Sequence, residues 1–395
     1  MKVLSTYFKG DRVIWIILLV LAMFSILAVY SASGMLAYKF QEGNTTYYLV
    51  RHFVQMCFAF FVIFLIHKIP YVYFSKLSQF FFYVSIILLL LTLLIGLNLN
   101  EASRWLKLPG GLTFQTSDFA KIVLIVFLAR RLSKRKGEIK NFKSAFHIIM
   151  FPVLAVCALI FPADFSTALI VFAAALIMMF IARVQRKYIF SLVGIAVAAG
   201  CLFMMTAMLF PENNRVETWK ARVEGFVSGD DESNFQADHA RIAIASGGII
   251  PNGPGQSVQR NILPHPYSDF IYAIIVEEYG ILLGGLLIPL MYLIFFNRSI
   301  KIVRKCKGSF SALMVAGLSS LLVIQAFVNM LVAVNLLPVT GQTLPFVSMG
   351  GTSMVFIGIA FGLILSVSRI IQEEEIKREL NAQTSNDSEG GDDEA

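Results

Sequence analysis

Charged residues are scarce in this chain: Asp, Glu, Lys and Arg together make up 15% of its 395 residues. A soluble domain has about 25%. This scarcity, together with 57% hydrophobic residues, excludes an ordinary soluble globular protein. Cysteine is also rare, and the four cysteines show no paired spacing, which argues against a disulfide framework and against a zinc site. What is missing therefore points to a chain that lies in a membrane.

Apolar runs of the length that a bilayer-crossing helix needs, about 17 to 25 residues, recur along almost the whole chain. They predict an all-α polytopic membrane protein with about ten spans and one long outer loop, residues 211–268, between the seventh and eighth spans. The predicted spans are Val13–Ser31, Tyr48–Ile66, Phe80–Leu97, Phe119–Leu132, Phe146–Phe161, Phe165–Ile181, Tyr188–Phe210, Phe270–Phe296, Leu313–Val334 and Thr352–Ser368. A cleaved signal peptide is the alternative for the first run, but its apolar core is longer than a signal's, which favours a retained helix.

Lys and Arg cluster in alternate loops, and the positive-inside rule makes that side cytoplasmic, with both termini on it. The clusters lie at 2–12, 67–76, 130–143, 183–187 and 298–307. The net charge of +8 then reflects topology and contact with anionic lipid headgroups, and does not indicate nucleic-acid binding. The chain divides into a membrane domain, residues 1–372, and an acidic tail, 373–395, which has too few apolar residues to bury and is predicted to be disordered.

The most informative stretch is 264–280, where a polar loop meets an apolar helix at Asp269. Glu277 and Glu278 follow about two turns, or roughly 12 Å, further along that helix. Acids at membrane depth cost several kcal/mol unless they face a polar cavity, a partner charge or a cation. Adjacent helical positions diverge by about 100°. Glu277 lies closer to the face of Asp269 and is the better site candidate, whereas Glu278 is interpreted as structural.

Other polar segments each allow two interpretations. The glycine-rich stretch 247–255 suits either an anion-binding backbone or a simple turn. The loop 335–353 suits a re-entrant or a surface loop. Asp118 and Lys121, three residues apart on one helix face, form either a self-neutralising pair or a lysine held for a phosphate. Asp164 suits a helix cap.

Four motifs, in order, resemble those of the SEDS family, the polytopic proteins of bacterial shape, elongation, division and sporulation. They are Arg104-Trp105 with QTSDFAK at 115–121, PADFSTAL at 162–169, PHPYSDFIYAIIVEE at 264–278 and LPVTGQTLPFVSMGGTS at 337–353. The resemblance covers Arg12 to about Arg369. Tyr267-Ser268 stands where the family has His-Thr, while Asp269 matches the family's essential aspartate.

The resemblance implies peptidoglycan glycan polymerisation. The family joins lipid II, a lipid-linked disaccharide-pentapeptide, on the outer face of the bacterial cytoplasmic membrane, releasing undecaprenyl diphosphate and working with a class B penicillin-binding protein. Asp269 is the implied catalytic base, no metal ligand is assigned, and a divalent cation, Mg²⁺ or Mn²⁺, is left open. The expected substrate-binding residues are Arg104, Lys121, Arg222, Gln236, Ser257, Glu277, Thr343 and Ser348.

The division branch of the family, with its septal location and divisome partners, is favoured over the elongation branch. Two functions of other classes compete with catalysis: a flippase that moves lipid II outward, and a scaffold that holds the penicillin-binding protein. Transporter sites lie near the bilayer midplane. Asp269 is predicted at the outer interface, which favours an enzyme.

Overall fold

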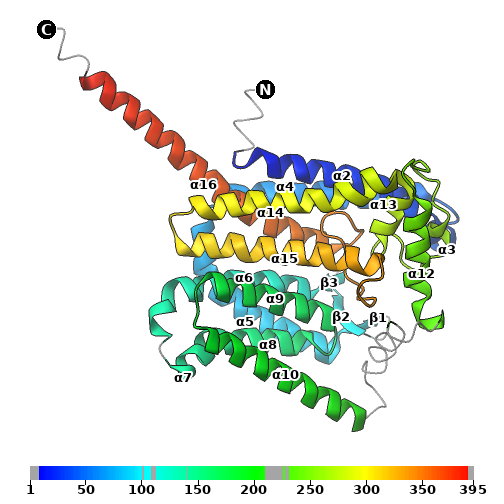
Figure 1. The fold of residues 1–395 in the computed structure, drawn as a ribbon, viewed down its shortest axis with the longest axis horizontal. Helices are drawn as coiled ribbons and strands as arrows, with labels where there is room; N and C mark the ends of the chain where they lie inside the picture. The colour runs from blue at the N-terminus through cyan, green and yellow to red at the C-terminus, as the bar shows by residue number, and fades with distance from the viewer. Residues whose placement is uncertain are drawn as a thin grey trace.

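The computed structural model describes residues 9–99, 102–107, 113–139, 141–209, 226 and 231–389. Long helices run side by side as a bundle, with small elements at its two ends (Figure 1). Every predicted span coincides with a helical segment, so the all-α polytopic fold is confirmed. In chain order these are α2 (Arg12–Ala32), α4 (Thr45–Lys68), α5 (Tyr71–Ile95), α6 (Thr116–Arg135), π-helical η2 (Phe146–Met150) with α8 (Phe151–Ile160), α9 (Phe165–Ile181), α10 (Arg186–Leu209), α13 (Ile271–Gly280) with η5 (Ile281–Leu286) and α14 (Leu287–Lys305), α15 (Ser309–Ala333) and α16 (Thr352–Glu389).

Among the described residues, eight helices are long and apolar enough to cross a membrane. Two predicted spans fall outside that set: α9 has only 17 residues, and α6 has 20 but carries Asp118, Lys121 and a basic last turn. All of α6 from Ala120 to Ala129 is buried inside the bundle. This helix therefore brings ionisable groups into the protein interior and keeps them away from lipid.

The two ends of the bundle carry different elements (Figure 1). One end has α3 (Gly34–Phe40), α12 (Asp231–Ser246) and a small antiparallel sheet of order β1-β2-β3. Its strands are β1 (Leu97–Leu99), β2 (Ala102–Lys107) and β3 (Thr113–Gln115). The other end has η1 (Lys136–Glu138), α7 (Phe142–Ala145) and the projecting part of α16, and the basic turns of α4, α6 and α14 lie there. By the positive-inside rule the second end is cytoplasmic and the first is outer.

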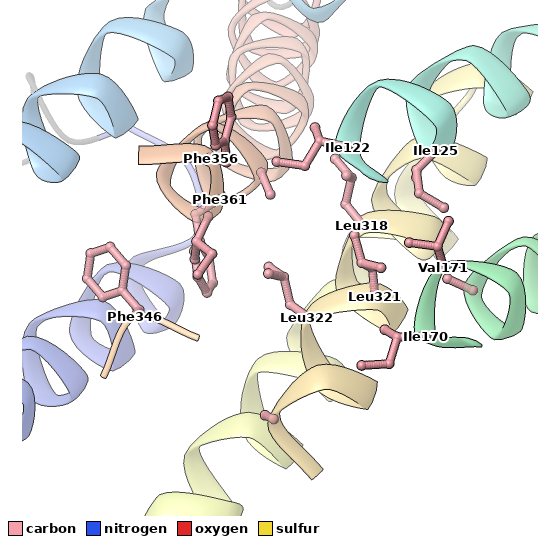
Figure 2. Close-up of a cluster of buried hydrophobic side chains, with 14 of the residues drawn as sticks. Ile122, Ile125, Ile170, Val171, Leu318, Leu321, Leu322, Phe346, Phe356 and Phe361 are labelled. Carbon is pink, nitrogen blue, oxygen red and sulfur yellow. The ribbon is translucent and has the colours of Figure 1, made fainter. Parts of the chain in front are cut away.

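Helix α15 runs through the centre of the bundle and contacts α6, α9, α14 and α16. Figure 2 shows isoleucines and valine of α6 and α9 meeting leucines of α15, with three phenylalanines nearby. A Cβ at Gly317 would collide with Met178 Sδ of α9 and Ile125 Cγ2 of α6. Close approach of α15 to its neighbours therefore depends on the lack of a side chain at Gly317.

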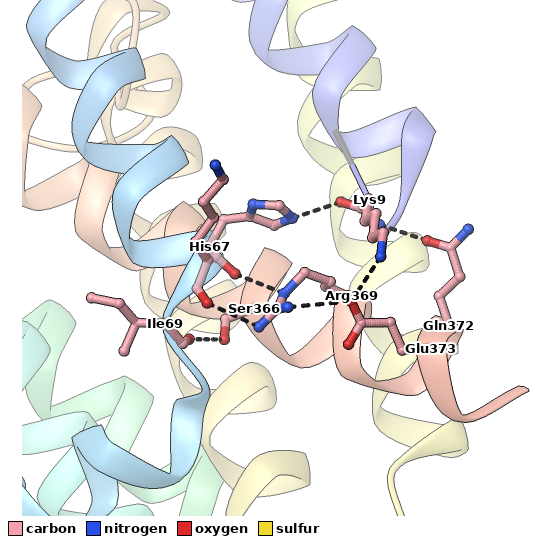
Figure 3. A network of polar contacts seen from close by, with 9 residues as sticks. Lys9, His67, Ile69, Ser366, Arg369, Gln372 and Glu373 are labelled. Carbon is pink, nitrogen blue, oxygen red and sulfur yellow. Dashed lines mark hydrogen bonds and ion pairs between the residues drawn. The ribbon is translucent and has the colours of Figure 1, made fainter. Parts of the chain in front are cut away.

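Polar contacts join the cytoplasmic ends of three segments (Figure 3). Arg369 of α16 donates to the carbonyls of His67 and Lys68 at the end of α4, at 3.0 and 3.1 Å. Glu373 pairs with both Lys9 at 3.2 Å and Arg369 at 3.3 Å. The first residues of the acidic segment are thus fixed to the N-terminal segment and to α4.

The prediction of disorder from Glu373 onward differs from the structure, in which α16 continues as a helix to Glu389. Glu374 forms an ion pair with Lys307 of the α14–α15 connection, and Glu375 forms one with Lys305 at the end of α14. Ion pairs and continuity with a buried helix stabilise this segment, neither of which composition reveals. The last residues, 390–395, lie outside the described part of the chain.

Candidate active site at the outer end

Asp269 lies in the turn of residues 265–270, which directly precedes α13; we call this the Asp269 turn. Its backbone N–H donates to His265 O at 3.3 Å, and Ser268 Oγ donates to Asp269 Oδ1 at 3.0 Å. The side chain is half-buried. A carboxylate before a helix N-terminus is stabilised by the helix dipole. Asp269 is thus held as an oriented acid that solvent still reaches.

The outer loop 335–351 packs directly against the Asp269 turn. Met349 N donates to Tyr267 O at 2.9 Å, and Ser348 Oγ donates to Ser268 O at 2.6 Å. Gly341 has φ of +67°, and a Cβ there would lie 3.6 Å from Asp269 Oδ2, so this loop passes beside the carboxylate. The loop is irregular but largely buried from Leu344 to Ser348, as irregular backbone at membrane depth requires.

Two side-chain amides of α15, four residues apart, bind the Asp269 turn and the outer loop 335–351. Asn329 Nδ2 donates both to Asp269 O and to Gln342 O, each at 2.7 Å. Gln325 Nε2 donates to Thr343 O at 3.0 Å. Neither amide was among the residues predicted from the sequence. Their signal was present, because buried amides on one face of an apolar span need polar partners.

Lys121 is 3% exposed and lies 2.6 Å from Asp118 Oδ1, so the predicted pair forms. Its ammonium also donates to Gln325 Oε1 at 3.0 Å. Asp118 Oδ2 is buried without a hydrogen-bond partner among the described residues. Lys121 is therefore linked through Gln325 to Thr343 of the outer loop. Both interpretations, neutral pair and phosphate-binding lysine, stay open.

Asp164 acts as the helix cap that its sequence context allows, because its side chain accepts from Thr167 N at 3.1 Å. It also accepts from Gln342 Nε2 at 3.4 Å, and the same Gln342 amide donates to Thr167 Oγ1 at 3.0 Å. The α8–α9 hairpin is thereby fixed to the outer loop 335–351. Asp164 therefore caps α9 and also takes part in the hydrogen-bond network that binds this hairpin to the outer loop.

Glu277 and Glu278 face the glycine-rich loop of residues 253–260. Glu277, 1% exposed, accepts from Ser257 Oγ, from Val258 N at 3.0 Å and from Gln259 N at 3.4 Å. Glu278, 0% exposed, accepts from Ser31 Oγ of α2. The two acids thus anchor this loop over α13, and Glu277 uses both oxygens to do so.

The phenol of Tyr267 lies beside the acid. Burial raises the pKa of Tyr267 above its ordinary value, and the Asp269 carboxylate and Tyr48 add to the rise. Its hydroxyl lies 3.1 Å from His265 Nδ1. The side chain that replaces the family's histidine is therefore a neutral hydrogen-bonding group at neutral pH.

The profile of the FtsW, RodA and SpoVE family, described as cell cycle proteins, matches residues 11–373. The chain belongs to this family. It is 31% identical to the probable peptidoglycan glycosyltransferase FtsW of Geobacter sp. (strain M18), over 91% of this chain and 96% of that protein. The FtsW of Bacillus subtilis (strain 168) is 29% identical, over 95% and 94%. Stage V sporulation protein E of that organism is 29% identical, over 91% and 97%.

Solved structures resemble this fold over nearly the whole chain. A chain from a peptidoglycan synthase complex that coordinates polymerization and crosslinking has a TM-score of 0.69 at 24% identity, covering 92% of this chain and 98% of that one. The rod shape determining protein RodA of Thermus thermophilus has a TM-score of 0.67 at 22% identity, with the same coverage. These likenesses establish the fold, and the predicted membership of the SEDS family is confirmed.

The structure brings some of the family-matched residues together. Thr343 and Ser348 lie in the outer loop beside Asp269, and Lys121 reaches that loop through Gln325. Ser257 of the loop 253–260 contacts Glu277 of α13. As substrate contacts, all of these residues stay predictions.

The structure places Gln236 and the backbone of Arg104, two further predicted site residues, but does not describe the third, Arg222. Gln236 is half-buried on α12. Arg104 lies in β2, but its side chain is outside the described part of the structure, and so is all of Arg222. No group of three or more His, Cys, Asp or Glu side chains that could hold a metal ion occurs in the described residues, and the question of a divalent cation stays open.

Proposed function

We propose that this chain is a peptidoglycan glycosyltransferase that polymerises lipid II on the outer face of the bacterial cytoplasmic membrane. The observation that carries the proposal is Asp269, a half-buried carboxylate held by Ser268 and by Asn329 at the outer end of the bundle. The printed names of its FtsW relatives support the reaction class. Those names also support a division role, with the septum as location and divisome proteins as partners, over elongation.

Asp269 acts as general base in an inverting displacement. The 4-hydroxyl of the acceptor N-acetylglucosamine loses its proton to the carboxylate as its oxygen attacks the donor anomeric carbon, and undecaprenyl diphosphate leaves. A positioned base contributes about 10² to 10⁴ in rate. The hydrogen bonds to its neighbouring peptide groups keep the carboxylate in one place, which such a step requires.

The leaving diphosphate gains stability from fixed positive charge, because that charge helps the transition state more than the ground state. Arg104, Lys121 and Arg222 are the cationic candidates. Lys121 is already paired with Asp118, so phosphate binding requires the lysine to share its charge with both groups. Its hydrogen bond to Gln325 directs it toward the outer loop 335–351, which supports this role.

The proposal is tested by adding labelled lipid II to the purified protein, with and without a class B penicillin-binding protein, and resolving glycan products on a gel. We expect polymer. If the protein translocates lipid II in proteoliposomes but forms no polymer, the flippase function is supported and the glycosyltransferase function is rejected. If both activities are absent while the penicillin-binding protein still binds, the scaffold function is supported.

The proposed partner is a class B penicillin-binding protein, whose single transmembrane helix docks on the membrane-embedded surface. The solved complex with a similar fold supports this proposal. We expect the contact near residues 226–255 or along η5, α14 and α15, where Leu286 of η5 and Leu290 and Leu293 of α14 are exposed. Co-purification from mild detergent should recover the partner, and replacing two of these leucines with alanine should weaken recovery without lowering the protein's thermal stability.

A further inference from the structure

The turn of residues 344–349, here called the Phe346 turn, fixes the Asp269 turn from one side. Ser348 Oγ accepts from Leu344 N at 2.8 Å and donates to Ser268 O at 2.6 Å. Met349 N donates to Tyr267 O at 2.9 Å. The peptide groups that immediately precede Asp269 are thus bound to the Phe346 turn, and a shift of this turn would move the catalytic carboxylate.

The Phe346 turn is strained. Phe346 has φ of +65°, a left-handed conformation that a bulky residue rarely adopts. Such a residue is destabilising by itself and persists only where its surroundings determine its conformation. Its ring is held between Phe60 of α4 at 5.3 Å and Phe361 of α16 at 5.8 Å between centroids; Figure 2 shows Phe346 and Phe361 side by side.

Side chains of separate helices bind the carbonyls on either side of Phe346. Tyr292 of α14 donates its hydroxyl to Pro345 O. Ser25 of α2 donates to Val347 O at 2.6 Å. Ser25 Oγ also lies 2.7 Å from Nε2 of His52 in α4. The backbone on both sides of Phe346 is therefore held by the hydroxyls of Tyr292 in α14 and Ser25 in α2. The Ser25 hydroxyl is in turn in contact with the imidazole of His52.

The proton inventory of this group fixes the state of His52. A serine hydroxyl has one proton, and the carbonyl of Val347 can only accept, so Ser25 gives its proton there. His52 Nε2 must then donate to Ser25, which leaves Nδ1 as the bare nitrogen. That nitrogen is buried without a partner among the described residues, and His52 is 0% exposed. The imidazole is thus a neutral Nε2–H donor aimed at Ser25.

This arrangement is costly for stability alone. A buried polar atom without a partner lowers the stability of the folded protein, and an apolar pair of similar shape would avoid that loss. The polar pair of Ser25 and His52 does something that an apolar pair could not do. It fixes the orientation of the Val347 carbonyl in a strained turn.

We infer that Ser25 and His52 are positioning residues for the glycosyl transfer: they orient the Phe346 turn, which in turn holds the peptide preceding Asp269. This inference rests on the proposed function. Neither residue contacts the reacting groups. Their effect passes through Val347, Ser348 and Ser268 to Asp269, and a displacement of the base by about 1 Å can cost on the order of 100-fold in rate.

The test compares Ser25→Ala and His52→Leu with two matched variants. His52→Gln places an amide N–H near the position of Nε2 and so restores the donor. Ser85→Ala removes a buried serine of α5 whose hydroxyl donates to Phe82 O of its own helix, at 2.7 Å, and to no other of the described residues. For each purified protein, kcat and KM for labelled lipid II, the thermal unfolding midpoint and amide hydrogen exchange of residues 264–270 and 344–349 are measured.

We expect Ser25→Ala and His52→Leu to lower kcat about tenfold with KM for lipid II within about twofold of wild type, and to speed exchange in both segments. His52→Gln should recover kcat to within about threefold, and Ser85→Ala should match wild type in every measurement. A drop in kcat that His52→Gln shares in full, or one that follows the loss of thermal stability in all variants, overturns the positioning role.

The proposed function and this inference fail in different ways. If wild type forms no polymer, the function fails, while unchanged exchange in Ser25→Ala and His52→Leu overturns the inference independently of turnover. If wild type and both variants polymerise equally well, only the inference fails.

Discussion

Two acidic positions about two turns apart on one segment have different surroundings. Asp269 is half-buried, and its peptide carbonyl and side chain are bound by neutral groups, Asn329 and Ser268. Glu277 is almost fully buried, and its oxygens accept from Ser257 and from two backbone N–H groups of the loop 253–260. Asp269 is thus held in place and stays partly exposed, while both carboxylate oxygens of Glu277 are buried and hydrogen-bonded to the loop.

The difference shows that depth alone does not identify a catalytic acid. Glu277 satisfies the rule that buried acids are costly and retained for a reason, but hydrogen bonds to a loop are a sufficient reason. A carboxylate that must take a proton from a substrate needs an accessible oxygen, which the partly exposed Asp269 offers.

The largest effect is expected at Asp269, the partly exposed acid. Asp269→Asn keeps the size of the side chain but removes its basicity, so polymer formation should fall by about 100-fold or more. Expression, thermal stability and recovery of the penicillin-binding partner should stay as in wild type. Asp238→Asn, at an exposed acid of α12 that pairs with Arg241, serves as control and should keep full activity. Full activity of Asp269→Asn would end its assignment as base.

A second, smaller effect is expected at Lys121, which is as buried as Glu277 but linked to the outer loop. Lys121→Met should lower turnover about tenfold. If the lysine only neutralises Asp118, adding Asp118→Asn should restore activity, because no unpaired charge then stays buried. If it serves the diphosphate, the double variant should stay impaired. We expect no rescue, measured as initial rates of the two single variants and the double variant.

At the fully bonded acid the effect should be on stability. Glu277→Gln replaces an acceptor of several hydrogen bonds by a group that can accept fewer, and should lower the free energy of unfolding by about 1–3 kcal/mol. Its thermal midpoint should fall, while the KM of the folded fraction for lipid II stays unchanged. An unchanged midpoint with a raised KM would instead support Glu277 as a substrate contact, as the sequence predicts.

The smallest effect is expected at Tyr267. Tyr267→Phe should change turnover at neutral pH by less than about twofold, because the phenol carries no charge there and the substitution removes none. The raised pKa of Tyr267 means that the folded protein holds the phenol proton more tightly than the unfolded chain, so stability is lost as pH rises past the ordinary value of about 10. The variant should match wild type in thermal midpoint at pH 8 and exceed it above pH 10. A difference at pH 8 would contradict this assignment.

The spans were predictable because an apolar run must be helical in a bilayer, where no water satisfies the backbone. Asp269 was predictable as well, from its place between a polar loop and an apolar helix and from its family motif. The helical start of the tail was not, because Glu374 and Glu375 form ion pairs with Lys307 and Lys305, which lie about 70 residues earlier in the chain. Asn329 and Gln325 were missed because their partners lie in other segments of the chain.

The sequence by itself determined the membrane class, the helical spans, the family and the identity of the candidate base, since each depends on local composition or on a contiguous motif. Tertiary structure alone decided that Asp269 is partly exposed while Glu277 is buried against the loop 253–260, that Lys121 joins the outer loop through Gln325, and that Ser25 and His52 lie behind the Phe346 turn. The physical reason is that hydrogen bonds and ion pairs act over about 3 Å. Residues hundreds of positions apart satisfy that distance only once the helices have packed.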